Sequence, residues 1–415
     1  MSQIIIKTSP PLSGCVKCSG SKNAALPILA ATILTHGKNK ITNVPHLSDV
    51  QYMLDILSQL GGICSHDNSC VSIDFSDCTS YHTPYEQVSK FRGSFLLAGP
   101  LLARMGKVQI SMPGGCPIGT RPIDLHLKGF SSLGAEVENG HGYVRLSCKK
   151  LKGAKIYLDF PSVGATENLI MAAALADGET TIENAAAEPE ICDLADFLIK
   201  QGAIIQGAGS DTVKICGVKE LTPCSHAIIS DRIEAGTFMS AFAITGGKGE
   251  ILNVNPLHLK PVTAKLTEMG AVICEKENSI IIDAHTPLTA STIKTLPFPG
   301  FPTDMQAQFS ALLCRTTGTS IIVETVFENR FLHISELNRM GAKIRIDGRS
   351  SVIEGGRTLT GAKVNAFDLR GGASLVLAGL CATGETEISG IEHINRGYEN
   401  LCGKLSSLGG NIFFE

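Results

Sequence analysis

Tryptophan is absent from this chain of 415 residues, and aromatic residues of all kinds make up only 5% of it. Long apolar runs are also missing: FLLAGPLLA, which begins at Phe95, is far shorter than the roughly 20 residues that a membrane-spanning helix needs. The opening segment MSQIIIKTSPPLSG lacks the basic stretch and apolar core of a secretion signal. We therefore expect a cytoplasmic protein that has no membrane partner.

An excess of charge of one sign is missing too. The chain has 36 basic and 39 acidic residues, a formal net charge of −3, and no run rich in Lys or Arg, so we expect no nucleic-acid partner. Its 14 cysteines, without an export signal, favour reduced thiols over a disulfide framework. The one close pair, Cys15 and Cys18, has no second pair or histidine cluster at metal spacing. We assign it to strand packing and expect no metal and no cofactor.

Glycine, in contrast, is abundant, with 43 residues. The phrase FSSLGAEV, which begins at Phe130, has the pattern of an amphipathic helix end, a glycine stop and the start of a strand. Similar phrases place glycines at Gly61, Gly134, Gly202, Gly270, Gly341 and Gly409. Because their intervals of 68 to 73 residues are too regular for independent helix ends, we predict six copies of one unit.

A second phrase fills each interval, with a helix of small apolar residues, a glycine-centred turn and a strand. NAALPILAATILTHGKNKITNV, from Asn23, is one example. Helices rich in Ala and Gly allow close packing around them, so we expect them to be buried, with the sheets outside. The length suggests two or three domains, and six copies divide evenly into two, which predicts an α/β protein of two domains.

Functional residues are expected where one copy departs from the others. SGSKNAALP (residues 19–27) and FPSVGATEN (160–168) each place polar residues before a helix. Such a pattern is typical either of backbone amides that bind an anion or of ordinary helix capping. In the first segment, the capping alternative leaves Lys22 solvated. SMPGGCPIGTRPIDLH (111–126) is typical of an exposed loop, in which a lone thiol, Cys116, is unusual. In FPGFPTDMQAQF (298–309), Asp304 is either a helix cap or a functional carboxylate.

Taken together, these motifs resemble the UDP-N-acetylglucosamine enolpyruvyl transferases over essentially the whole chain. The matching segments, in order, are SGSKNAALP, GGCPIGTRPIDLH, SVGATEN, DRIEAGTF, FPTDMQAQF, FENRF and NRGYE. The resemblance implies two inside-out α/β domains, each of three repeats with buried helices and outer sheets. Residues 23–229 would form the domain with the Cys116 loop, and residues 1–22 and 230–415 the domain with Asp304.

The reaction that the resemblance implies is transfer of the enolpyruvyl group of phosphoenolpyruvate to the 3-hydroxyl of UDP-N-acetylglucosamine, with release of phosphate. Cys116 would give a proton to the methylene carbon, and Asp304 would face the sugar hydroxyl. Phosphonate epoxides such as fosfomycin, which resemble phosphoenolpyruvate, would react with the Cys116 thiol. Catalysis is thereby assigned to Cys116, Asp304, Lys22, Arg121 and Arg396.

The resemblance also assigns a set of substrate-binding residues. These are Lys22, Asn23, Arg92, Arg121, Pro122, Ile123, Asp124, Leu125, Ser162, Val163, Gly164, Asp304, Val326, Arg330, Arg370 and Arg396. One departure concerns Phe160, since some members of the family have a lysine there. The exchange removes a possible cation for the diphosphate.

Two alternatives stay open at this point. The chain could be a 5-enolpyruvylshikimate-3-phosphate synthase, which shares the donor but not the cysteine loop, or a non-catalytic paralogue that binds the UDP-sugar. The loop and FPTDMQAQ favour the sugar-nucleotide enzyme, and the presence of all expected catalytic side chains favours an enzyme over a paralogue. The sequence leaves the oligomeric state open, with a monomer as the expectation.

Overall fold

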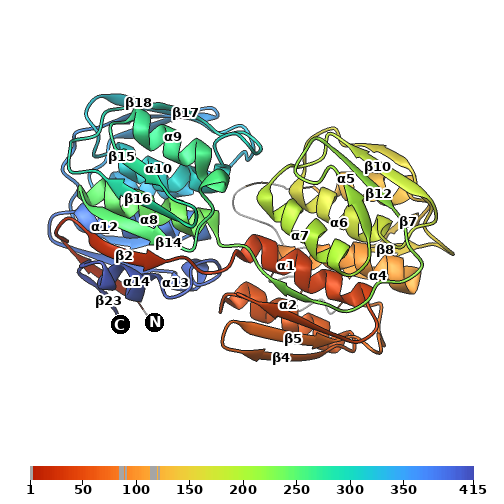
Figure 1. Ribbon diagram of the computed structural model, residues 1–415. Helices are drawn as coiled ribbons and strands as arrows, with labels where there is room; N and C mark the ends of the chain where they lie inside the picture. The colour runs from red at the N-terminus through yellow and green to blue at the C-terminus, as the bar shows by residue number, and fades with distance from the viewer. Residues whose placement is uncertain (1–2, 84–87, 89–90, 113–118, 120–121) are drawn as a thin grey trace. The chain divides into compact units, whose positions relative to one another are not determined.

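The computed structural model describes residues 3–83, 88, 91–112, 119 and 122–415. The described residues form two compact units: unit 1 contains residues 3–19, 119 and 230–415, and unit 2 contains residues 20–83, 88, 91–112 and 122–229 (Figure 1). The main divisions follow Ser19 and Ile229, whereas the sequence placed them after residues 22 and 229. Lys22 consequently belongs to unit 2.

Each of the repeated glycines follows an amphipathic helix, as predicted. These helices are α2 (Ser48–Gln59), α5 (Asp124–Ser132), α7 (Pro189–Lys200), α9 (Lys260–Glu268), α11 (Leu332–Arg339) and α14 (Leu401–Ser407). The six glycines have φ between +89° and +109°, a region that side chains with a Cβ avoid. At the first of them, Gly61 N–H donates to Ser58 O at 3.2 Å and Gly62 N–H to Leu57 O at 3.0 Å, which closes the helix.

The helices of small residues are buried, also as predicted. They are α1 (Lys22–Ala31), α4 (Ala98–Met105), α6 (Val163–Ala173), α8 (Arg232–Thr245), α10 (Gln306–Leu313) and α12 (Leu369–Cys381). In α8 every residue from Ile233 to Ile244 is buried. A Cβ at Gly99 of α4 would collide with the backbone of Asn168 in α6, so these two helices pack at a distance that only glycine permits.

Further short helices among the described residues are η1 (Thr32–Leu34), η2 (Arg92–Leu97), η3 (Pro256–Leu259), η4 (Thr303–Met305) and α13 (Ile391–Ile394). The strands of unit 2 are β3 (Lys38–Thr42), β4 (Ile63–Asp67), β5 (Cys70–Asp74), β6 (Lys107–Ser111), β7 (Glu136–Asn139), β8 (Tyr143–Ser147), β9 (Lys155–Tyr157), β10 (Glu179–Glu183), β11 (Ile204–Gln206), β12 (Thr212–Cys216) and β13 (Ser225–Ala227). Those of unit 1 are β1 (Ile4–Lys7), β2 (Ser13–Lys17), β14 (Lys248–Leu252), β15 (Val272–Glu275), β16 (Ser279–Asp283), β17 (Thr292–Lys294), β18 (Thr319–Val323), β19 (Ile344–Asp347), β20 (Ser350–Glu354), β21 (Lys363–Asn365), β22 (Glu385–Ser389) and β23 (Ile412–Phe414).

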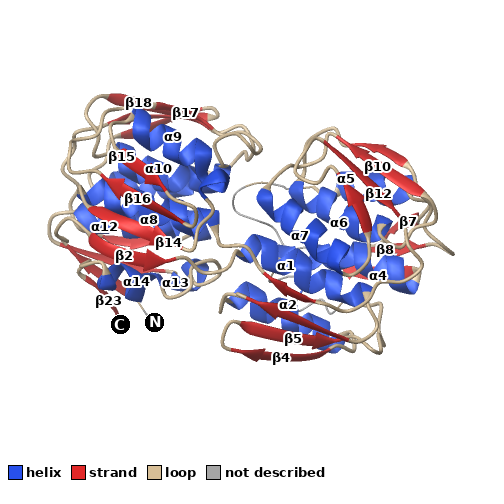
Figure 2. Cartoon of the chain, in the orientation of Figure 1, coloured by secondary structure: helices blue, strands red, loops and turns tan. Residues whose placement is uncertain are grey.

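Within each unit the strands form sheets outside the buried helices (Figure 2). The sheets of unit 2 have the orders β13-β3-β5-β4, β6-β8-β7 and β11-β12-β10-β9. Those of unit 1 have the orders β21-β22-β1-β23, β15-β16-β14-β2 and β17-β18-β20-β19. In β10 the side chains of Thr180 and Ile182 are buried, whereas those on either side point outward, as expected for a sheet with one covered face.

The chain ends of each unit are paired into its sheets. β13, at the end of unit 2, runs parallel to β3, with His226 opposite Ile41. β2 of unit 1 runs parallel to β14, with Val16 opposite Ile251. Each unit has its own cluster of buried apolar residues, so each has a hydrophobic core of its own. Over the described ranges, the helices are too short or too polar to cross a membrane.

Candidate active site

Asp304 lies in η4 of unit 1, where two arginines hold it. Its Oδ1 accepts a hydrogen bond from Arg330 Nη2 at 2.6 Å, and its Oδ2 accepts from Arg370 Nη2 at 2.9 Å and Nε at 3.3 Å. The Asp304 side chain is 26% exposed, whereas those of the arginines are 6% and 3% exposed. Asp304 lies in the first turn of η4, as the capping alternative expected, but its carboxylate accepts hydrogen bonds from the guanidinium groups of Arg330 and Arg370.

The charges of these arginines determine the ionisation of Asp304. Burial by itself would raise the pKa of Asp304, but the positive charges and hydrogen bonds of Arg330 and Arg370 hold this pKa well below its usual range. The carboxylate is therefore ionised throughout the pH range in which enzymes work. It can accept a hydrogen bond from a hydroxyl, but it takes up the proton readily only when the ion pairs weaken.

Arg330 lies in the segment that connects β18 to α11, and three residues hold its guanidinium group. Its Nη1 donates to Thr303 Oγ1 at 2.8 Å, and its Nη2 reaches Asp304. Its Cζ lies 5.1 Å from the ring centre of Phe327, within range of a cation–π contact. These contacts set the orientation of the guanidinium plane before any ligand binds.

Arg370 is fixed by the start of α12. Asp368 caps this helix, accepting the N–H groups of Arg370 and Gly371 at 2.9 Å each. The Arg370 guanidinium lies 5.3 Å from the ring centre of Tyr398, whose hydroxyl is 2.9 Å from Thr237 Oγ1. Tyr398 closely follows Arg396, which lies half-buried just after α13. The segment NRGYE thus lies against the same part of unit 1 as Arg370.

In unit 2, the first turn of α1 places Lys22 against a carboxylate. Lys22 Nζ lies 3.1 Å from Asp49 Oδ2 near the start of α2, with side chains 12% and 2% exposed, so the lysine is not the solvated one of the alternative. Ser21 caps α1 by accepting the Ala24 N–H at 3.3 Å. Asp49 was missed from the sequence, where it resembles any acidic residue in the first turn of a helix. Asn23 follows Lys22 and is half-buried.

The start of α1 is anchored to the end of unit 2. Ser21 N–H donates to Ile229 O at 2.7 Å, and Ile229 N–H donates to Asp193 Oδ2 at 3.2 Å. The other oxygen of Asp193 lies 2.8 Å from Nε2 of His226 in β13. This series of contacts fixes where the Lys22 backbone lies relative to the last strand of the unit.

A buried asparagine of α6, Asn168, links three helices of unit 2 that begin at or next to predicted binding residues. Its Oδ1 accepts from Gly99 N–H at 2.8 Å, and its Nδ2 donates to Phe95 O in η2 and lies 3.0 Å from Nδ1 of His126 in α5. A Cβ at Gly164 would lie 3.4 Å from the His126 ring, so that ring lies beside the start of α6. Asn168 therefore joins α6, which begins at Val163, to η2, which begins at Arg92, and to α5, which begins at Asp124.

The start of α6 is partly exposed. Ser162 caps the helix by accepting Ala165 N–H at 3.3 Å, and Ser162, Val163 and Gly164 are half-buried. Phe160 is 42% exposed. This position thus presents an apolar surface.

Replacement of Asn168 by alanine should destabilise unit 2. The change leaves the Gly99 N–H and the Phe95 carbonyl buried without this partner, and we expect a loss of about 3 kcal/mol in the free energy of unfolding. Thermal unfolding followed by circular dichroism measures it. Asn139→Ala, at an exposed position of β7, is the control and should change the midpoint little. Equal midpoints for the two variants would contradict the role of Asn168.

The predicted residues divide between the two units. Unit 2 contains Lys22, Asn23, Arg92, Pro122, Ile123, Asp124, Leu125, Ser162, Val163 and Gly164, and unit 1 contains Asp304, Val326, Arg330, Arg370 and Arg396. Cys116 and Arg121 lie outside the described residues.

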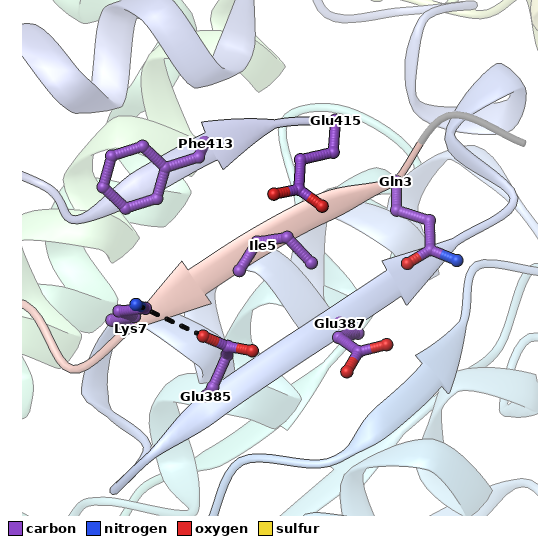
Figure 3. A pocket seen from close by; sticks show the side chains of 7 residues that line it. All are labelled: Gln3, Ile5, Lys7, Glu385, Glu387, Phe413 and Glu415. Carbon is purple, nitrogen blue, oxygen red and sulfur yellow. Dashed lines mark ion pairs between the residues drawn. The ribbon is translucent and has the colours of Figure 1, made fainter.

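A hollow of about 430 Å³ lies on the outer face of the sheet that contains β1 (Figure 3). Glu385, Glu387 and Glu415 line it, and Lys7 Nζ lies 3.4 Å from Glu385. Its lining includes none of the predicted site residues, and three carboxylates disfavour an anionic ligand. We therefore do not assign the predicted chemistry to this hollow.

Comparison with known proteins matches this chain to carboxyvinyltransferases, the class of enzyme that its motifs resemble. Residues 6–405 match the family model for EPSP synthase (3-phosphoshikimate 1-carboxyvinyltransferase). The chain is 56% identical over 411 residues to UDP-N-acetylglucosamine 1-carboxyvinyltransferase 1 of Caldanaerobacter subterraneus subsp. tengcongensis, with 99% of each chain covered. It is 53% identical over 415 residues to UDP-N-acetylglucosamine 1-carboxyvinyltransferase 2 of Clostridium tetani, with 100% of each covered.

Among solved structures, the enolpyruvyl transferase NikO from Streptomyces tendae aligns with a TM-score of 0.90 at 24% identity, covering 100% of this chain and 98% of that one. EPSP synthase from Acinetobacter baumannii aligns with a TM-score of 0.77 at 19% identity, covering 100% of both. At these identities the similarity shows the fold alone. It confirms the predicted fold class, with buried helices and outer sheets.

Proposed function

This chain belongs to the EPSP synthase family of enolpyruvyl transferases, and we propose that it transfers the enolpyruvyl group of phosphoenolpyruvate to the 3-hydroxyl of UDP-N-acetylglucosamine. That transfer is the first committed step of peptidoglycan synthesis. The observation that carries the assignment is the identity of 53% to 56%, over nearly the full length, with relatives named UDP-N-acetylglucosamine 1-carboxyvinyltransferase. EPSP synthase itself is only a distant relative, with 19% identity in the structural comparison.

The chemistry is an addition followed by an elimination. The sugar oxygen bonds to C2 of phosphoenolpyruvate as C3 takes a proton, which gives a tetrahedral intermediate. C3 then loses a proton, and phosphate leaves from C2. All atoms come from the two substrates and from exchangeable protons, so the reaction itself requires no cofactor.

We assign the proton donor for C3 to the thiol of Cys116 and the hydroxyl acceptor to Asp304. A carboxylate held by Arg330 and Arg370 binds the 3-hydroxyl as an oriented hydrogen-bond acceptor, and the hydroxyl proton passes to Asp304 as the oxygen attacks. Lys22, Arg121 and Arg396 are the cations that would balance the charge of phosphoenolpyruvate. These roles are supported by the residue types and by the fixed geometry of Asp304.

Separate groups of residues are assigned to the parts of the nucleotide sugar. Arg92, residues 122–125 and the amides at the start of α6 suit the uridine diphosphate, because a helix N-terminus favours an anion. Val326 and Asp304 suit the sugar. One chain supplies every assigned residue, so a monomer is sufficient, and we assign it to the cytoplasm.

Phosphate release tests the assignment. With phosphoenolpyruvate present, the protein should release phosphate when UDP-N-acetylglucosamine is added and not when shikimate 3-phosphate is added. Phosphate release with shikimate 3-phosphate, and none with UDP-N-acetylglucosamine, would make the protein a 5-enolpyruvylshikimate-3-phosphate synthase. Binding of the nucleotide sugar without phosphate release would make it a non-catalytic paralogue.

Replacing Arg396 by alanine should raise the KM for phosphoenolpyruvate by about 10-fold or more, because a charge-assisted contact to a multiply negative donor is lost. The KM for UDP-N-acetylglucosamine should change little. Steady-state kinetics with each substrate varied in turn measures both values. Arg357→Ala removes an exposed arginine of the same unit and serves as the control. Equal behaviour of the two variants would make Arg396 a surface residue.

The pH profile should reveal the effect of Arg330 on Asp304. In the wild type the pKa of Asp304 lies below its usual range, so kcat should show no acid limb from this group above about pH 5. In Arg330→Met, only Arg370 is left to oppose the effect of burial, so the pKa of Asp304 should rise. The acid limb of kcat should then move up into the measurable pH range. An identical profile for both proteins would contradict the dependence of turnover on ionised Asp304.

A further inference from the structure

Glu324 is a fully buried carboxylate that no sequence motif singled out. It follows β18 in unit 1, and 0% of its surface is exposed. Burial removes a carboxylate from water, which is unfavourable unless donors in the protein replace the lost hydration. The partners of Glu324 therefore indicate why the chain tolerates it.

Four donors surround its two oxygens. Oε1 accepts from Thr295 Oγ1 at 2.9 Å, from Val326 N–H at 2.8 Å and from Phe327 N–H at 3.2 Å. Oε2 accepts from Thr303 Oγ1 at 2.9 Å. A single carboxylate thus fixes two segments, the one with Val326 and the one that precedes Asp304.

The direction of each hydrogen bond can be assigned. Arg330 Nη1 lies 2.8 Å from Thr303 Oγ1, and a guanidinium can only donate, so this hydroxyl accepts from Arg330. The one proton of the hydroxyl then goes to Glu324. Arg330 Nη2 donates to Asp304 at 2.6 Å. The result is a continuous series in which Glu324, Thr303, Arg330 and Asp304 each fix the next.

A neighbouring pair of contacts stiffens the same place. Thr325 N–H donates to Thr295 Oγ1 at 2.9 Å, and Thr325 Oγ1 donates to Thr295 O at 2.6 Å. Thr295 therefore binds both Glu324 and the residue after it. The backbone between Glu324 and Phe327 has little freedom to move relative to β17 and β18.

We propose that Glu324 is a positioning residue that holds Asp304, through Thr303 and Arg330, and the Val326 backbone in the arrangement that the sugar nucleotide requires. The proposal rests on the function assigned above. Glu324 touches neither substrate in this scheme. It acts on the acceptor side of the reaction, so its loss should affect kcat and the sugar nucleotide, and not the binding of phosphoenolpyruvate.

The test uses Glu324→Gln in the full-length chain. The amide has the size of the carboxylate, but its nitrogen cannot accept, so either Thr303 or the donors on Oε1 lose their partner. We expect kcat to fall about 10- to 100-fold, the KM for UDP-N-acetylglucosamine to rise several-fold, and the KM for phosphoenolpyruvate to stay within about 2-fold. Glu354→Gln is the matched control on β20, where the side chain is 45% exposed, and should leave all three values unchanged.

A second pair of variants, at Thr303, tests the same series of contacts even if Glu324→Gln does not fold. Thr303→Val keeps the shape of the side chain and removes the hydroxyl, whereas Thr303→Ser retains it. The valine variant should lose kcat about 10-fold or more, and the serine variant should retain it within about 2-fold. A purely structural role would lower the unfolding midpoint of the valine variant without separating the two kcat values.

The outcomes separate this proposal from the assigned function. The positioning role alone would be overturned if the wild type is active and Glu324→Gln has a normal kcat. The same conclusion would follow if the two Thr303 variants have equal kcat values. A parallel rise in the KM for phosphoenolpyruvate would also overturn it, because the effect would not be confined to the acceptor. A wild-type chain that neither binds nor converts UDP-N-acetylglucosamine would overturn both.

Discussion

Asp304→Asn is expected to lower kcat by about 10³-fold while the protein stays folded. An amide nitrogen cannot accept the hydrogen bond of the sugar hydroxyl, and general-base contributions are typically of order 10²- to 10⁴-fold. The amide oxygen can also satisfy only one of the two sides on which Arg330 and Arg370 donate. Steady-state phosphate release measures the loss, and thermal unfolding verifies that the fold remains.

The control for this variant is Asp347→Asn, at an exposed position of β19. It makes the same chemical change in the same unit and should leave kcat unchanged. Binding of UDP-N-acetylglucosamine to Asp304→Asn, measured by calorimetry, should weaken only modestly because the nucleotide contacts remain. Near-normal turnover of Asp304→Asn would remove Asp304 from the mechanism.

Complete and irreversible inactivation by fosfomycin is the second large effect that we expect. The phosphonate resembles the phosphate group of phosphoenolpyruvate, so the cations Lys22, Arg121 and Arg396 would hold the epoxide beside Cys116. The sulfur then attacks an epoxide carbon, the C–O bond opens, and the resulting alkoxide takes up a proton. The other 13 of the 14 cysteines are an internal control, because mass spectrometry should find one adduct, on the peptide with GGCPIG.

Variants of Cys116 separate its acid role from its nucleophilic role. Cys116→Asp can still donate a proton but is a poor nucleophile towards the epoxide, so it should remain active and become resistant. Cys116→Ser should lose more turnover, because a hydroxyl is a weaker acid than a thiol. An adduct on another cysteine, or full sensitivity of the aspartate variant, would show that the chemistry belongs to another residue.

The repeated architecture could be predicted from the sequence because it depends on local rules. A residue just past a helix end needs φ above zero, which favours glycine, and Gly61 and Gly409 have φ of +108° and +94°. Helices made of small residues must be buried to gain stability, and α8 is buried as expected. Both signals are short in sequence and occur six times, which made the pattern recognisable without a structure.

The contacts that organise the site could not be predicted in this way. Arg330 and Arg370 meet Asp304 from 26 and 66 residues away in the sequence, and no local pattern specifies such pairs. Asn168 and Glu324 resemble an ordinary helix residue and an ordinary strand end. Their importance follows from burial and from the number of donors and acceptors that they satisfy, which only the folded chain defines.

The position of the new bond in the product tests the central claim most directly. The wild-type protein would be incubated with UDP-N-acetylglucosamine and phosphoenolpyruvate labelled with ¹³C at C2, and the purified product examined by NMR. We predict a three-bond coupling between the labelled carbon and H3 of the sugar, which places the enol ether on the 3-oxygen. Label attached at another hydroxyl, or recovered only as unchanged phosphoenolpyruvate, would contradict the account.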